Sequence, residues 1–337
     1  MPTPLDPTRP VRWGILGAGG IAAVVGADIA ASPDSTVVAV GARDAGRARV
    51  LADSLGAPRS YGSYAELVAD TDVDVVYIAT THAQHHEHAL LAIEAGKHVL
   101  VEKAFTLTAW EAREVVEAAS ARDVFCMEAM WMRANPLVRR GLEIAASGAI
   151  GRVIGVTAEH GQRFPFDPAH RLFDLAAGGG ALLDLGVYSA TFAWIFLGAP
   201  DGVATTGELS PTGSDSTTVM QWSYADGRFA HAWCTTESAT PCTALVAGTA
   251  GTLSFGTPFY RPDTLVVRTA AGSETLVDEL GGNGYGPQVA EVERCLRLGL
   301  AESPLVPLGD TVAIMALLDG ARSAVGVRYP ADNRGVN

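Results

Sequence analysis

A glycine-rich turn near the amino terminus constrains the fold of this chain more than any other feature. The run GAGGIA (17–22) follows an apolar run, VRWGILG (11–17), and opens a stretch of small residues with a helical pattern. Glycines at such a strand–turn–helix junction allow a tight turn and close approach of the backbone to a pyrophosphate, while the helix N-terminus supplies N–H donors. The predicted dinucleotide-binding residues here are Gly17, Gly19, Gly20 and Ile21.

The first third of the chain continues the alternation of strands and helices that a parallel α/β sheet requires. After the first strand, further strands are expected at 37–43, 73–80, 98–102 and 124–129. The run at 73–80 is almost entirely apolar, as expected of a strand that is covered on both faces. We therefore expect residues 1–130 to form a Rossmann domain with a parallel sheet.

Residues 131–337 follow a different pattern. Longer runs such as VIGVTAEHG (153–161) replace the short strands, and Asp226-Gly227 is a strong hairpin signal. Hairpins are expected at 217–234 and 265–277, and helices at about 181–197, 287–299 and 309–325. This pattern predicts a second domain of the α+β class with a mostly antiparallel sheet.

The end of the second strand indicates which dinucleotide binds. An NAD site usually has an acidic residue there for the ribose 2′-hydroxyl, but this chain has Ala42 followed by Arg43. A guanidinium suits a 2′-phosphate, and Arg47 lies one helical turn further on. We therefore expect NADP to be preferred over NAD. Two alternatives remain: both arginines are solvated, or a shift of one residue brings Asp44 to the ribose.

Polar residues also follow the strands at 73–80 and 98–102. The carboxyl ends of parallel strands share the edge of the sheet where cofactors bind. The residues expected to face the cofactor at this edge are Thr80, Thr81, His82, His85, Glu102 and Lys103. The dense histidines between 82 and 88 also raise the alternative of a metal site, but we favour a cofactor-facing loop and helix N-terminus, with no metal.

Lys103 and one segment of the second domain carry the expected chemistry. An ammonium group near a reacting hydroxyl can polarise it or hold a proton relay, and Lys103 stands where a strand leaves the core. In GGGALLDLGVY (178–188), Asp184 and Tyr188 are four residues apart and share one helix face. We expect Tyr188 to exchange the substrate proton, Lys103 to stabilise the developing alkoxide and Asp184 to orient them. The alternative is that Tyr188 is an ordinary core tyrosine.

Together, the glycine loop, the Glu102-Lys103 pair and the GGG…DLGVY segment make the chain similar to the glucose–fructose oxidoreductase/inositol dehydrogenase (Gfo/Idh/MocA) family. Motifs at 127–136 and 170–174 resemble its branch of dimeric dihydrodiol dehydrogenases and NADP-dependent xylose dehydrogenases. Where the family usually has proline after the lysine, this chain has Ala104. The resemblance implies an open-faced sheet in the second domain, a homodimer or higher homo-oligomer built on that sheet, and a substrate site lined by Trp131, Arg133 and Arg171.

The resemblance also implies an activity. It is NADP-dependent transfer of a hydride between the nicotinamide and a carbinol carbon of a sugar, polyol or cyclic trans-diol. The reverse direction, reduction of a keto- or anhydro-sugar, is an alternative because concentrations set the direction. A non-catalytic NADP-sensing regulatory protein is a third interpretation, although a sensor needs neither Lys103 nor Tyr188.

Charge and cysteine content indicate the partners and the compartment. The formal net charge is −13, which argues against a nucleic-acid or anionic-membrane partner. The four cysteines form no CxxC pair and the amino terminus has no signal-peptide pattern, so a cytoplasmic protein with reduced thiols is expected. The longest apolar run, 181–199, contains Asp184 and is expected to be a buried helix rather than a membrane span.

Overall fold

The computed structural model divides the chain into two compact units. The residues that the structure describes are 1–278, 280–330 and 332. Unit 1 comprises residues 1–131 and 280–312, and unit 2 comprises the described residues between 132 and 278 and those from 313 onward. The contacts therefore do not divide the chain as expected from the sequence, which suggested one uninterrupted domain over 131–337. The reason is long-range packing of α8 (Gly286–Leu298) against α1 (Gly20–Ala31).

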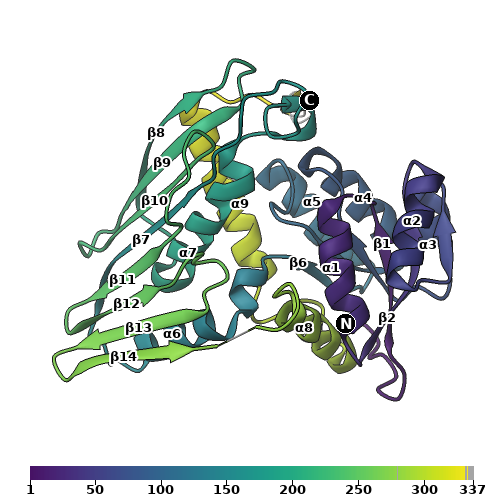
Figure 1. Ribbon diagram of the computed structural model, residues 1–337, viewed down its shortest axis with the longest axis horizontal. Coiled ribbons are helices and arrows are strands. Elements are labelled where there is room, and N and C mark those ends of the chain that lie inside the picture. The colour runs from purple at the N-terminus through teal and green to yellow at the C-terminus, as the bar shows by residue number, and fades with distance from the viewer. Residues whose placement is uncertain (279, 331, 333–337) are drawn as a thin grey trace. The chain divides into compact units, whose positions relative to one another are not determined.

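Unit 1 contains a six-stranded parallel sheet with the strand order β3-β2-β1-β4-β5-β6 (Figure 1). Its strands are β1 (Val11–Leu16), β2 (Ser35–Gly41), β3 (Arg59–Tyr61), β4 (Val75–Ile78), β5 (His98–Val101) and β6 (Cys126–Glu128). Besides α1 and α8, its helices are α2 (Ala45–Leu55), α3 (Tyr64–Ala69), α4 (His82–Glu94) and α5 (Ala109–Ala121). The predicted Rossmann fold is confirmed. The strand order changes direction between β1 and β4, where such sheets bind ligands at the carboxyl ends of the strands.

Helices cover both faces of this sheet. α1 packs against α2 and α8, whereas α4 packs against α3 and α5. β4 is buried along its whole length, as a strand between two helical layers must be. Three helices of unit 1 begin at a side-chain N-cap, because Asp44, Ser63 and Thr108 each accept a hydrogen bond from the backbone N–H three residues later. Strand β3 and helix α3 were not expected from the sequence.

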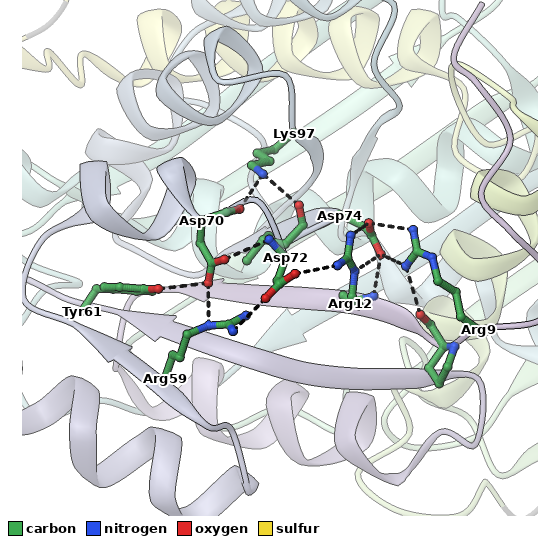
Figure 2. Close-up of polar contacts among 10 residues, drawn as sticks. Arg9, Arg12, Arg59, Tyr61, Asp70, Asp72, Asp74 and Lys97 are labelled. Atoms are coloured by element: carbon green, nitrogen blue, oxygen red, sulfur yellow. Dashed lines mark hydrogen bonds and ion pairs between the residues drawn. The ribbon is translucent and has the colours of Figure 1, made fainter.

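A network of ion pairs stabilises the amino ends of the strands (Figure 2). Asp74, immediately before β4, accepts hydrogen bonds from Nη1 of Arg9 at 2.6 Å and Nη2 of Arg12 at 2.8 Å. Burial alone would raise the pKa of Asp74, but the hydrogen bonds from Arg12 and Arg9 outweigh it and lower the pKa to about 2. Lys97, immediately before β5, donates to two backbone carbonyl groups in the segment between α3 and β4. This edge of the sheet is therefore fixed by charge.

Unit 2 is built on an eight-stranded sheet with the order β14-β13-β12-β11-β7-β10-β9-β8. Its strands are β7 (Val153–Gly161), β8 (Gly202–Leu209), β9 (Asp215–Ser223), β10 (Phe229–Thr235), β11 (Ala244–Gly248), β12 (Gly251–Phe255), β13 (Thr264–Thr269) and β14 (Gly272–Val277). Its helical elements are η1 (Trp131–Ala134), whose first residue belongs to unit 1, α6 (Pro136–Ala146), η2 (Leu175–Ala177), η3 (Leu182–Gly186), α7 (Val187–Leu197) and most of α9 (Leu308–Val325). Strands β7 and β10 pair in parallel and the other described pairs are antiparallel, which confirms the predicted mostly antiparallel sheet.

The helices of unit 2 lie on one face of its sheet (Figure 1), with α7 against β7 and β10. The strands alternate accordingly, and in β10 the side chains of Ala230, Ala232 and Cys234 are buried. On the other face, Phe229 is 45 % exposed and Leu245 of β11 is 39 % exposed. This second face, called the open face below, therefore presents apolar side chains to its surroundings.

The most apolar helical stretch of the chain belongs to the core of unit 2. Among the described residues, Leu175–Leu197 is the one helical stretch long and apolar enough to cross a membrane, yet 83 % of its most apolar window is buried inside the protein. The expected buried helix over this region is confirmed. The four cysteines are buried free thiols.

Candidate active site

The glycine loop after β1 leaves an open surface at the carboxyl edge of the parallel sheet. Gly17 has φ = +114°, and a Cβ atom there would come within 2.7 Å of the carbonyl oxygen of Ala79. A Cβ on Gly19 or Gly20 would meet no atom within 4 Å. The loop thus packs closely against the end of β4 on one side and exposes bare backbone on the other, at the N-terminus of α1. These residues fit a bound pyrophosphate.

Two arginines follow β2, and one of them reaches this loop. The Arg47 guanidinium donates from Nη2 to the carbonyl oxygen of Ala18 at 2.7 Å, so it lies beside the glycine turn. Asp44 accepts a hydrogen bond from the backbone N–H of Arg47 at 3.0 Å and caps α2. Arg43 and Arg47 are both exposed. The carboxylate that raised the NAD alternative is thus engaged at a helix terminus, and two guanidinium groups remain at the surface of the strand end.

The four histidines of α4 contact different partners. His85 is buried, with Nδ1 2.9 Å from the carbonyl oxygen of Ala104 and Nε2 3.2 Å from that of Thr80. Burial lowers the pKa of His85 to about 3, so the neutral ring donates from one nitrogen only. Nε2 of His82 lies 3.2 Å from the carbonyl oxygen of Lys103. His86 and His88 instead contact Glu114 and Thr80. His82 and His85 therefore hold the backbone around Lys103.

The residues after β5 are held by hydrogen bonds. Glu102 is buried and accepts from the Tyr77 hydroxyl at 2.6 Å and from the backbone N–H of Lys103 at 3.2 Å. The Lys103 side chain is partly exposed at the carboxyl end of the strand. Ala104 follows it through a cis peptide bond. Thr81, the N-cap residue of α4, donates from Oγ1 to Gln84 at 3.2 Å. The sheet topology thus brings every predicted cofactor residue of unit 1 to one edge.

Trp131 has an aromatic partner that the sequence did not suggest. Its ring is buried and stacks on Tyr285, with ring centroids 4.1 Å apart and an interplanar angle of 19°. The backbone N–H of Tyr285 donates to Asp28 of α1 at 2.8 Å. The loop before α8 is thereby attached to the helix that follows the glycine turn.

In unit 2, the structure brings Arg171 and Asp184 together. The guanidinium donates from Nη1 to Oδ1 at 3.1 Å and from Nη2 to Oδ2 at 3.3 Å, a two-pronged pair. Asp184 lies in the π-helical segment η3 and Tyr188 in the first turn of α7, both largely buried. Arg133, the other predicted arginine, lies in η1. The Arg171 side chain is half exposed, so it can contact both Asp184 and a ligand.

Two aromatic neighbours of Tyr188 were missed by the sequence analysis. The ring of Tyr260 lies 4.8 Å from that of Tyr188, and the ring of His160 lies 5.6 Å from it. His160 also stacks on Tyr260 with centroids 4.6 Å apart, and its Nε2 lies 3.0 Å from the Gln162 side-chain nitrogen. His160 is the second-last residue of β7, a strand that was expected, but neither His160 nor Tyr260 belongs to a recognisable motif. The phenol of Tyr188 thus has an aromatic wall beside it.

Comparison with protein families matches both halves of the chain. Residues 11–130 match a model described as the oxidoreductase family with an NAD-binding Rossmann fold. Residues 138–254 match the GFO/IDH/MocA C-terminal domain. These two matches cover most of the chain and follow the same order as the expected domains.

Similar proteins include two that are named as dehydrogenases. Trans-1,2-dihydrobenzene-1,2-diol dehydrogenase of Mus musculus is 38 % identical over 337 residues, covering 96 % of this chain and 99 % of its own. D-xylose 1-dehydrogenase (NADP(+)) of Hypocrea jecorina is 35 % identical over 367 residues, covering 95 % of this chain and 93 % of its own. Among solved structures, a 3-ketoreductase from Actinomadura kijaniata has a TM-score of 0.83 at 24 % identity, covering 94 % of this chain and 98 % of its own. That last likeness concerns the fold.

Proposed function

This chain belongs to the Gfo/Idh/MocA family of oxidoreductases, and we propose that it is an NADP-dependent dehydrogenase acting on a CH–OH group. The proposed substrate is a sugar, polyol or cyclic trans-diol. The observation that carries the proposal is the carboxyl edge of the unit 1 sheet, where an open glycine loop follows β1 and Lys103 follows β5, with β4 between these two strands. The names of the relatives, a dihydrodiol dehydrogenase and a xylose dehydrogenase, support the substrate class.

NADP, when bound, accepts or supplies the hydride. The backbone of Gly19 and Gly20 would hold its pyrophosphate, because a Cβ atom at either position would meet no atom within 4 Å. Arg43 and Arg47 would hold a 2′-phosphate, and each charge-assisted contact is worth about 1.5–3 kcal/mol. NADP is therefore expected to bind more tightly than NAD. Equal dissociation constants for the two cofactors, measured by protein fluorescence, would contradict this assignment of the arginines.

The protein's own residues handle the proton and the charge. Tyr188 is proposed to exchange the hydroxyl proton of the substrate at Oη, and Lys103 to stabilise the developing alkoxide with its ammonium group. Asp184 holds Arg171 in a fixed orientation and is proposed to orient the phenol one turn away. The aromatic rings of His160 and Tyr260 exclude water from one side of Tyr188. Trp131, Arg133 and Arg171 are proposed substrate contacts.

The proposal extends to assembly and compartment. The apolar side chains of the open face, such as Phe229 and Leu245, support a homodimer or higher homo-oligomer in which a second copy covers this face. The buried free thiols support a reducing, cytoplasmic compartment. The net charge of −13 supports small-molecule rather than nucleic-acid or membrane partners.

Two other functions remain candidates. Reduction of a keto- or anhydro-sugar uses the same residues in the opposite direction. A regulatory NADP sensor would need the glycine loop but not Lys103 or Tyr188, and the presence of both residues favours the enzyme.

A substrate panel tests the proposed function. The purified protein is mixed with NADP and aldoses, polyols, anhydro-sugars or cyclic trans-diols, and nicotinamide reduction is followed by absorbance. We expect turnover on at least one member of the panel, lost in Tyr188→Phe. Tight NADP binding without turnover, in this direction and with NADPH and keto-sugars in the other, would instead favour the sensor.

A further inference from the structure

Asp215 is a buried carboxylate that none of the roles above uses. It is the first residue of β9 and is 2 % exposed. Its Oδ2 accepts hydrogen bonds from the backbone N–H of Leu182 at 2.7 Å and from Oγ1 of Thr218 at 2.9 Å. Leu182 begins the helical segment η3–α7, which carries Asp184 and Tyr188. A side chain from a strand therefore satisfies a donor at the start of this helix.

The glycines before this helix fit around Asp215. Gly180 has φ = +141°, a conformation that glycine adopts without strain, and a Cβ atom there would collide with Oδ1 of Asp215. A Cβ on Gly179 would come within 2.6 Å of the carbonyl oxygen of Arg171. The hydroxyl of Tyr329 donates to the carbonyl oxygen of Gly179 at 3.0 Å. Glycine at these positions lets the turn lie directly against the carboxylate.

A carboxylate at this place is costly, which argues for a role beyond filling space. Burial raises the pKa of Asp215 to about 6, although the hydrogen bonds from Thr218 and Leu182 oppose the shift. The ionisable side chains that face it, Tyr329 and Cys234, have pKa values raised by burial and are neutral. Oδ1 has no hydrogen-bond partner among the described residues. The groups that balance the carboxylate are thus the Leu182 N–H, the Thr218 hydroxyl and the dipole at the helix start.

We infer that Asp215 is a positioning residue for the proposed reaction: it fixes the first turn of η3–α7 and thereby the place of the Tyr188 hydroxyl. The inference rests on the proposed function, because that function gives Tyr188 the proton. Tyr188 lies less than two turns beyond Leu182, and a misplacement of about 1 Å can cost roughly 100-fold in rate. The glycine loop of unit 1 takes no part in this anchor, so NADP affinity is expected to be unaffected.

Three variants separate this role from general packing. Asp215→Ala removes the anchor. Asp215→Asn keeps an acceptor oxygen for Leu182 without the charge, and Thr218→Val removes the other hydrogen bond of the carboxylate while leaving the helix anchor. The readouts are kcat and KM on a substrate that the wild type oxidises, the NADP dissociation constant, and hydrogen exchange of the amides at 182–188. If Asp215→Ala does not fold, Asp215→Ser replaces it.

We expect Asp215→Ala to lower kcat by about 10- to 100-fold, with unchanged NADP affinity and faster exchange at 182–188. Asp215→Asn should recover kcat to within about threefold of the wild type, since it restores the acceptor, and Thr218→Val should behave like the wild type. Wild-type kcat and exchange in Asp215→Ala would overturn the inference, as would an asparagine variant no better than alanine. If the wild type oxidises no panel member, the proposed function fails, and hydrogen exchange alone still decides whether Asp215 anchors the helix.

Discussion

The two ends of β5 carry the only two lysines of the chain, and the two lysines lie in contrasting surroundings. Lys97 precedes the strand and Lys103 follows it by two residues. The same side chain thus stands at the amino edge and at the carboxyl edge of one parallel sheet. Comparing them shows which edge the fold uses for stability and which it leaves for a ligand.

At the amino edge, Lys97 is enclosed. Its ammonium donates to the carbonyl oxygens of Asp70 at 2.7 Å and Val73 at 2.9 Å (Figure 2). Burial lowers the pKa of Lys97, and neighbouring carboxylates such as Asp70 and Asp74 oppose the shift. The lysine therefore closes a turn between α3 and β4 and is not positioned for a substrate.

At the carboxyl edge, Glu102 and His82 contact the backbone of Lys103. The side chain is partly exposed, on the edge that carries the open glycine loop. A parallel sheet places all its strand ends of one kind at one edge, so one edge can be filled with structural ion pairs while the other binds a cofactor. The comparison gives Lys97 a structural role and supports the role proposed for Lys103.

The largest expected effect is the loss of turnover in Lys103→Met. Removing the ammonium removes stabilisation of the developing alkoxide, and kcat is expected to fall by about 10²- to 10⁴-fold with NADP affinity nearly unchanged. Steady-state kinetics and a fluorescence titration with NADP measure the two quantities. Normal turnover in this variant would remove Lys103 from the chemistry.

Lys97→Met should have the opposite profile. It leaves one buried and one part-buried carbonyl group without this donor, and the free energy of unfolding is expected to fall by about 1–3 kcal/mol. Urea unfolding followed by circular dichroism measures this change. The kcat of the folded variant should match that of the wild type. A large loss of kcat under conditions where the variant is fully folded would contradict the structural role of Lys97.

Asp74→Asn should destabilise the same edge in a pH-dependent way. The carboxylate has its pKa lowered to about 2 in the folded protein from 3.8, so its stabilisation is present above pH 3.8 and is lost as the pH falls through 2. We expect a loss of about 1–2 kcal/mol at pH 7, shrinking as acid protonates the wild type.

Asp72→Asn is the matched control for that variant. The Asp72 side chain is 54 % exposed, and its ion pairs with Arg12 and Arg59 are open to solvent. Its loss should cost less than about 1 kcal/mol at pH 7. Equal destabilisation in Asp72→Asn and Asp74→Asn would show that burial of the carboxylate does not decide the strength of this network.

Local patterns in the sequence predicted much of the fold. The glycine loop, the strand β7 and the hairpin at Asp226-Gly227 were all read from short-range signals, and the structure has them. Three of the missed elements lack such signals: β3 has three residues, α3 has six, and the edge strand β8 (GVATTGEL) has no apolar alternation. Helix α6 was also missed, although Asn135 and Pro136 at its start are typical of a helix N-terminus. The return of α8 to unit 1 depends on contacts across the chain that no local pattern records.

The sequence predicted those residues of the candidate site that directly follow a strand of the parallel sheet. Parallel topology alone predicted that the residues after β1, β2, β4 and β5 share an edge. The Arg171–Asp184 pair was not foreseen as a pair, and His160 and Tyr260 were not singled out, because these contacts join separate segments of unit 2. Asp44 was considered as a ribose ligand, although its position before a helix is also typical of an N-cap.

Amine labelling of the native protein tests the comparison of the two lysines most directly. The protein is treated with limiting acetylating reagent, with and without NADP, and modification at each lysine is read by peptide mass spectrometry beside residual turnover. We predict that Lys103 is acetylated with a parallel loss of turnover and is protected by NADP, while Lys97 stays unmodified. Acetylation of Lys97 at the same rate, or full acetylation of Lys103 with turnover intact, would contradict the account.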